Sequence, residues 1–144
     1  MGVSYLTTSD LVARFGAAQL AMIADRDNDG AADEPVLARA IDDAGSVVDL
    51  FVRGRYALPL SPVDPAIAVI VGDLARRFLY GDATEVPDSV IDADKAARRQ
   101  LELIAKGDVK LTSAAASSSE PAGALEVETA GDAPFFTSDN LKSF

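Results

Sequence analysis

Apolar residues recur at helical spacing in five stretches of the chain, and no stretch alternates in a strand pattern for more than four residues. The opening stretch starts with Thr and Ser residues suited to an N-cap at positions 7–9 and reaches a glycine, Gly16, that is expected to end it. A second short helix is predicted over residues 17–24, with Leu20 and Ile23 on its inner face. Both helices are therefore predicted to be brief and to lie near the start of the domain.

The longest amphipathic stretch covers residues 33–52. Asp33 is suited to its N-cap, and Pro35 falls in the first turn, where its missing N–H is tolerated. Apolar residues then recur every three or four positions, at Leu37, Ile41, Ala44, Val48 and Phe51. This spacing predicts a helix of about 20 residues with one broad apolar face.

Three prolines in residues 56–65 forbid a helix there, and two more helices are predicted beyond that point. The fourth begins with Asp64 as cap and is apolar almost all round, so we expect it to be central. The fifth is predicted from an Asp88 cap to about Lys106, with a short edge strand over residues 109–111 after it. The fold class predicted is all-α: a small bundle of about five helices with an extended, mostly irregular C-terminal tail.

The composition changes near residue 112, where the segment TSAAASSSE has linker chemistry and no periodicity. We therefore predict a helical domain over residues 1–111, followed by a linker and tail over residues 112–144. Three of the six phenylalanines lie in the last ten residues. Because aromatic residues are rare in segments that stay unfolded, we predict that the tail docks on a partner, the alternative being that it folds back on its own domain. The predicted anchors are Phe135, Phe136, Leu141 and Phe144.

Charge and composition exclude several classes of function. The chain has 144 residues, no cysteine and no histidine, which excludes disulfides, Cys- or His-ligated zinc and catalysis by a thiolate or a His base. A net charge of −10 argues against wrapping nucleic acid. The start lacks signal-peptide features, and the longest apolar run, residues 65–72, is too short for a membrane helix. We expect no enzyme, no cofactor and no membrane partner.

One motif suggests metal chemistry. Asp25, Asp27 and Asp29 occupy positions 1, 3 and 5 of an EF-hand pattern, with a glycine at position 6 and Asp33 at position 9. Position 12, which requires a bidentate Glu, is Val36. Two interpretations stay open: a weak calcium site, or an Asx-rich turn between two helices whose carboxylates cap the next helix. The spacing favours the turn.

A second cluster consists of Arg53, Arg55 and Tyr56 at the exit of the long helix. It is predicted either to form a contact patch for an acidic partner surface or to place its two arginines on the carboxyl end of that helix.

Four segments carry a family resemblance, in the order YLTTSDLVARFGAAQL, DRDNDG, GRYALPLSPV and FFTSDNLKSF. Over residues 5–111 and about 134–144 the chain resembles a family of small proteins of Mu-like phages and prophages that is placed among head–tail connector or adaptor proteins. The resemblance implies a small helical bundle that assembles as a ring beneath the twelvefold portal and extends the DNA channel.

The implied partners are the portal protein, neighbouring neck proteins and further copies of the chain, in a ring that is expected to be a dodecamer. The implied location is the virion neck, after assembly in the host cytoplasm, with DNA passing through the channel without specific binding. A small calcium-responsive protein-binding module that uses the loop from Asp25 to Glu34 is the alternative function.

Overall fold

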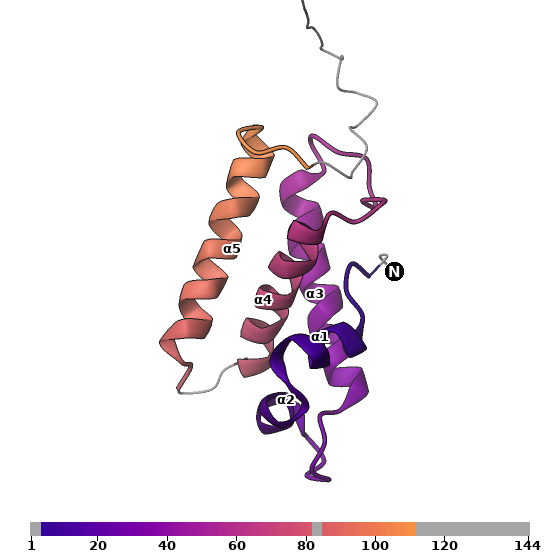
Figure 1. The fold of residues 1–144 in the computed structure, drawn as a ribbon, viewed down its shortest axis with the longest axis vertical. Helices are drawn as coiled ribbons and strands as arrows, with labels where there is room; N and C mark the ends of the chain where they lie inside the picture. The colour runs from indigo at the N-terminus through magenta and orange to yellow at the C-terminus, as the bar shows by residue number, and fades with distance from the viewer. Residues whose placement is uncertain (1–3, 82–84, 112–144) are drawn as a thin grey trace, which may run out of the picture.

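The fold is all-α, as predicted. A computed structural model describes residues 4–81 and 85–111, and these residues form five helices and no strand (Figure 1). The helices are α1 (Thr8–Phe15), α2 (Ala17–Ala24), α3 (Glu34–Val52), α4 (Pro65–Tyr80) and α5 (Asp88–Lys106). The predicted tail, residues 112–144, lies outside the described residues.

The first two helices are delimited by local contacts. The Thr7 hydroxyl accepts from the Asp10 N–H at 3.0 Å, and the Thr7 N–H donates to the Asp10 carboxylate at 3.3 Å, which completes a capping box. Gly16 has a φ of 92°, which a side chain would disfavour, and it both ends α1 and precedes α2. This glycine therefore fixes the sharp change of direction between the two short helices.

The later helices confirm most of the predicted boundaries, with one correction. Asp64 caps α4 by accepting from the Ala66 N–H at 2.9 Å, and Gly107 ends α5 with a φ of 89°. The predicted Asp88 cap is wrong, because Pro87 occupies the N-cap position and Asp88 is the first helical residue. Pro87 has a φ of −54° and a ψ of 142°, a non-helical conformation that suits an N-cap, and the Asp88 carboxylate lies in the first turn, where the helix dipole favours it.

The core lies between the three long helices. Helices α3, α4 and α5 run side by side, and α1 and α2 pack against α3 and α4 near the end where α3 begins (Figure 1). Helix α4 contacts α2, α3 and α5 and buries seven residues, which agrees with its predicted central place. None of the helices in the described part of the chain is long and apolar enough to span a bilayer.

Two buried tyrosines tie distant segments to the bundle. The Tyr5 hydroxyl donates to Asp49 at 2.5 Å and accepts from the Leu60 N–H at 3.2 Å. Burial and the bond to the Asp49 carboxylate raise the pKa of Tyr5 to about 12. The Tyr56 hydroxyl accepts from the Leu111 N–H at 2.9 Å.

The edge strand predicted over residues 109–111 does not form. The Val109 N–H donates to the Leu103 carbonyl and the Leu111 N–H donates to Tyr56, so this segment turns back over the end of α5. An edge strand needs a neighbouring strand to pair with, and the described residues contain none.

Candidate functional site

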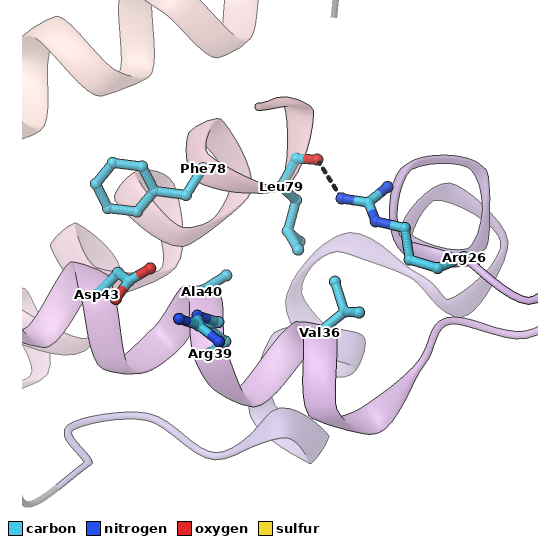
Figure 2. A pocket seen from close by; sticks show the side chains of 7 residues that line it. All are labelled: Arg26, Val36, Arg39, Ala40, Asp43, Phe78 and Leu79. Carbon is cyan, nitrogen blue, oxygen red and sulfur yellow. Dashed lines mark hydrogen bonds between the residues drawn. The ribbon is translucent and has the colours of Figure 1, made fainter. Parts of the chain in front are cut away.

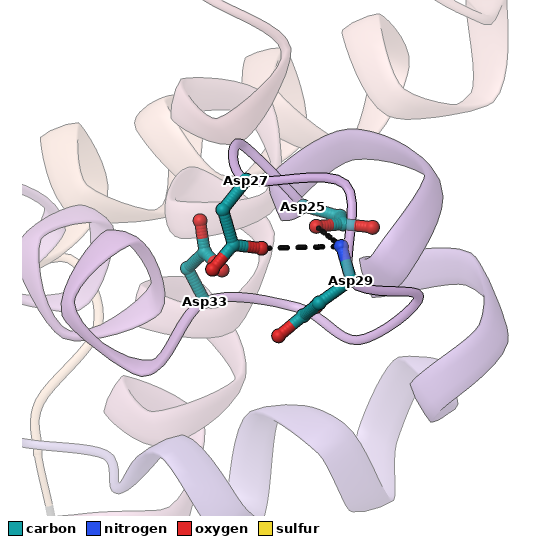
Figure 3. Close-up of side chains that lie close together, drawn as sticks. All are labelled: Asp25, Asp27, Asp29 and Asp33. Carbon is teal, nitrogen blue, oxygen red and sulfur yellow. Dashed lines mark hydrogen bonds between the residues drawn. The ribbon is translucent and has the colours of Figure 1, made fainter.

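The predicted carboxylates converge in the loop between α2 and α3, residues 25–33, which we call the acidic loop (Figure 3). Asp25, Asp27, Asp29 and Asp33 each place one carboxylate oxygen within 4.8 Å of the others. These are the four side chains whose spacing along the sequence suggested a calcium site, and calcium binding by them stays a prediction.

The cluster is organised by backbone donors. The two oxygens of Asp25 accept from the N–H groups of Asp29, at 3.1 Å, and Gly30, at 2.8 Å. Asp27 also accepts from the Asp29 N–H, at 3.2 Å, as Figure 3 shows. Asn28 and Gly30 have φ values of 61° and 90°, which lets consecutive N–H groups turn inward. This is an Asx-rich turn, but its carboxylates bind N–H groups of the loop itself, whereas the prediction had them cap the next helix.

Asp33 holds the position expected of it but makes a different contact. It precedes α3, yet its side chain makes no capping hydrogen bond there and accepts instead from the Arg26 N–H at 2.9 Å. The carboxylate therefore closes the acidic loop rather than capping the helix. The prediction that Asp33 caps this helix is wrong in that respect.

Two carboxyl groups of the acidic loop have pKa values shifted in opposite directions. Desolvation, the hydrogen bond shared with Asp25, and the charges of Asp29 and Asp33 all raise the pKa of Asp27. Desolvation also opposes the charge of Asp25, but the N–H groups of Gly30 and Asp29 outweigh it and lower the pKa of that carboxyl. The acidic loop thus concentrates negative charge that a cationic partner would relieve.

The oxygen-only donor set fits a hard cation such as calcium, except at one position. Val36, at the place of the bidentate Glu, lines a cavity of about 260 Å³ together with Arg26, Arg39, Phe78 and further residues of α3 and α4 (Figure 2). An apolar side chain there offers no ligand. The four aspartates would therefore hold a calcium ion with an incomplete coordination shell.

Arg26 is a structural residue that the sequence did not reveal. Its guanidinium donates to the carbonyls of Ile23, at 3.0 Å, and Leu79, at 3.5 Å, the second of which is drawn in Figure 2. The side chain therefore anchors the acidic loop to the carboxyl end of α4. No sequence pattern marks this contact, because Leu79 is 53 residues away.

The predicted arginine patch is rearranged by the fold. Arg55 donates to the carbonyls of Ala105, at 3.4 Å, and Lys106, at 3.3 Å, so it covers the carboxyl end of α5 rather than that of α3. Tyr56 is only 6% exposed and belongs to the core, so its side chain is not a contact surface in this structure. Arg53 is exposed.

Near Arg55 the fold brings the exposed Arg53 to the segment that carries Lys106 and Lys110, with the exposed Asp108 between the two lysines. Arg53 follows α3, Lys106 ends α5, and Lys110 precedes the residue that binds Tyr56. We call Arg53, Lys106 and Lys110 the basic end. The predicted tail anchors Phe135, Phe136, Leu141 and Phe144 lie outside the described residues.

Comparison with known proteins identifies relatives in Mu-like phages. The chain is 28% identical over 109 residues to the Mu-like prophage FluMu protein gp36 of Haemophilus influenzae, covering 76% of each sequence. It is 24% identical over 142 residues to gene product J of Escherichia phage Mu, covering 94% of this chain and 95% of the relative.

The family described as "Bacteriophage Mu, Gp36" matches residues 5–128, which include all five helices and continue into the segment predicted to be a linker. With a match over most of its length, the chain belongs to this family of Mu-like phage proteins.

Proposed function

We propose that this protein is a structural component of the phage neck: a head–tail connector, or adaptor, that forms a ring under the portal and joins the capsid to the tail. The observation that carries the proposal is membership of a Mu-like phage family, with a relative in phage Mu matched along nearly its whole length. The proposed partners are the portal protein, neighbouring neck proteins and other copies of the chain, in a ring of twelve.

The chemistry of the chain suits a structural role better than a catalytic one. It contains no cysteine or histidine, and among the acidic side chains of residues 4–81 and 85–111 only Asp64, the cap of α4, is buried. A net charge of −10 would let DNA slide through a channel without adhering, because like charges do not form the phosphate contacts that hold DNA. We therefore propose no enzymatic activity and no specific DNA binding.

A stop codon early in the gene, in a prophage that encodes this chain, tests the proposal. The expected lysate contains DNA-filled heads and free tails that are not joined, and a plasmid copy of the gene restores joined particles. Electron microscopy counts the two populations. Heads that still carry tails at the normal frequency would overturn the proposed function.

Tail docking has a matched test. Deleting residues 134–144 is expected to change the free energy of unfolding by no more than about 0.5 kcal/mol and to abolish incorporation into particles. Deleting residues 113–123, a stretch of the same length without phenylalanine, is the control and should leave incorporation intact. If the first truncation unfolds the protein, the tail belongs to its own core; if it still joins heads, the docking proposal is wrong.

A calcium-responsive binding module is the second candidate function. The observation in its favour is the convergence of four carboxylates within 4.8 Å. Weak binding is expected because position 12 lacks a ligand, and a sensor needs a tighter site than this donor set provides.

A further inference from the structure

Opposite net charges lie at the two ends of helix α3. This helix begins at the acidic loop and ends beside the basic end, and its 19 residues span about 28 Å. In Figure 1 the loop between α2 and α3 lies at the bottom of the molecule, and the carboxyl end of α5 lies at the top. Among the described residues, the acidic end carries four aspartates with Arg26 between them, and the opposite end carries Arg53, Arg55, Lys106 and Lys110 with Asp108 between the lysines. The net charges of the two ends are therefore opposite.

The acidic end also contains an apolar groove. A cavity of about 470 Å³ is lined by α1, α2, the acidic loop and the start of α3. Its lining includes Val12, Ala17, Ala18, Ala31, Glu34 and Leu37. One wall is thus residues 30–32 of the acidic loop, which Asp29 and Asp33 flank in the sequence. The lining also includes Glu34, whose carboxylate accepts from the Thr8 hydroxyl at 2.6 Å, so the apolar groove lies beside negative charge.

The basic end has the complementary form. Val109 is 45% exposed between Lys106 and Lys110, and its N–H donates to the Leu103 carbonyl at 3.3 Å, which holds it over the end of α5. Arg55 binds the last carbonyls of this helix and so keeps the turn in place. Val109 is thus exposed between Asp108 and Lys110, with Lys106 at the end of the preceding helix.

We propose that the basic end of one copy seats in this groove of the next copy, with Val109 against the apolar floor and the lysines against the acidic loop. The inference rests on the proposed ring and deepens it by naming the contact between subunits. A ring requires a heterologous interface made of two different surfaces, and complementary charge selects this pair of surfaces. The contact is weak in the free protein, because charge complementarity adds more to orientation than to affinity and the net charge opposes association.

Zero-length carbodiimide cross-linking tests the contact directly. Equal amounts of the unlabelled and the nitrogen-15-labelled full-length protein are mixed at low salt, and mass spectrometry identifies peptides that join the two populations. Lys106 or Lys110 of one copy is expected to be joined to a carboxylate of residues 25–34 of another, with a yield that falls as salt is added. Joining of these lysines to residues 112–144 instead, or no intermolecular product, overturns the proposal.

Neutral variants supply the controls. Asp27→Asn/Asp29→Asn keeps an acceptor oxygen at each position, and Lys106→Gln/Lys110→Gln removes two charges from the other surface. Each is expected to lower the cross-link yield by roughly fivefold or more. Asp42→Asn/Asp43→Asn on α3 and Lys95→Gln/Arg99→Gln on α5 change the net charge equally at exposed sites elsewhere and should leave the yield within about twofold.

Mixing the two variants makes the test specific to a heterologous contact. The aspartate variant keeps a working basic end, and the lysine variant keeps a working groove. The mixture is therefore expected to regain cross-linked pairs but to form no products of three or more copies. If the mixture stays uncross-linked, or if the controls lose as much yield as the variants, the proposal is wrong. Unjoined heads and tails after loss of the gene would uphold the proposed function even then, so the two failures are distinguishable.

Discussion

The two charged ends of the molecule are built in opposite ways. The acidic loop is a continuous segment whose carboxylates accept hydrogen bonds from N–H groups two to seven residues away, such as the bonds to Asp25 from Asp29 and Gly30. The basic end is assembled from segments 50 to 55 residues apart, joined by Arg55 and Tyr56. The negative charges therefore stay near one another in any conformation, whereas the positive surface exists only when the bundle is folded.

This difference separates local order from global stability. Bonds within the acidic loop are solvent-exposed, so losing one affects mainly the turn. The bond between Tyr56 and Leu111 is buried and closes the bundle, so losing it affects the whole cooperative unit. Substitutions at the two ends should consequently lower the free energy of unfolding by different amounts.

The largest effect on stability is expected at Tyr56, which joins the segments of the basic end. Tyr56→Ala should lower the free energy of unfolding by about 3–5 kcal/mol, because it empties a buried aromatic site. Tyr56→Phe should cost about 1–3 kcal/mol, because it leaves the Leu111 N–H without its acceptor. Urea unfolding followed by circular dichroism measures both, with the exposed Arg53→Ala as a control expected within about 0.5 kcal/mol of the parent. An unchanged Tyr56→Phe variant would show that the closing bond adds nothing.

Tyr5 provides a pH-dependent counterpart. Its folded pKa of about 12 lies above the usual value of 10, so the stabilisation is complete below pH 10 and is lost as pH rises toward 12. We expect a loss of about 1–2 kcal/mol over that interval, after allowing for solvent screening. Unfolding of the parent and of Tyr5→Phe at a series of pH values measures it. The Phe variant should lose less stability, and equal losses would contradict the assigned pKa.

Local signals explain how much of the fold could be predicted. Thr7, Gly16, Asp64 and Gly107 act on their own or neighbouring backbone, so all five helices were placed correctly from the sequence. Asp88 was misassigned because Pro87 and Asp88 both carry start signals, and the non-helical conformation of the proline moved the helix start by one position.

In the candidate sites, too, local features could be predicted from the sequence and contacts between distant segments could not. The four aspartates of the acidic loop were predicted because their spacing alone brings them together. The roles of Tyr56, Arg55 and Arg26 were not, since each depends on a partner about 50 residues away that only the packed bundle supplies. Val109 was assigned to a strand because its neighbours alternate, but no strand among the described residues lies beside it.

At the acidic end, Asp25→Ala should lower the free energy of unfolding, but by less than Tyr56→Ala does. The substitution removes the acceptor of two backbone N–H groups, those of Asp29 and Gly30, but both remain accessible to water. Asp25→Asn should recover much of the loss because its amide oxygen can accept one of them. Asp42→Ala, exposed on α3, is the matched control and should change stability by less than about 0.5 kcal/mol. An Asp25→Ala variant as destabilised as Tyr56→Ala would break the distinction between the two ends.

Calcium should have the smallest effect. The Val36 position leaves the shell incomplete, so we expect a dissociation constant of about 10⁻⁴ to 10⁻³ M. At 1 mM calcium such binding adds about 0.4–1.4 kcal/mol to the free energy of unfolding. Isothermal titration and unfolding with and without a chelator measure the two quantities.

The pattern of calcium dependence should distinguish the two ends. Asp25→Asn/Asp27→Asn should abolish the calcium effect, and Asp42→Asn/Asp43→Asn should leave it unchanged, because only the first pair belongs to the converging carboxylates. Lys106→Gln/Lys110→Gln should also leave it unchanged, because those side chains belong to the other end. Calcium should nevertheless weaken the cross-link between copies, because it neutralises the aspartates of the acidic loop, which the lysines approach. Sub-micromolar binding would contradict this expectation and favour the calcium-responsive module. Such an affinity would require further ligands, because the four described aspartates leave the coordination shell incomplete.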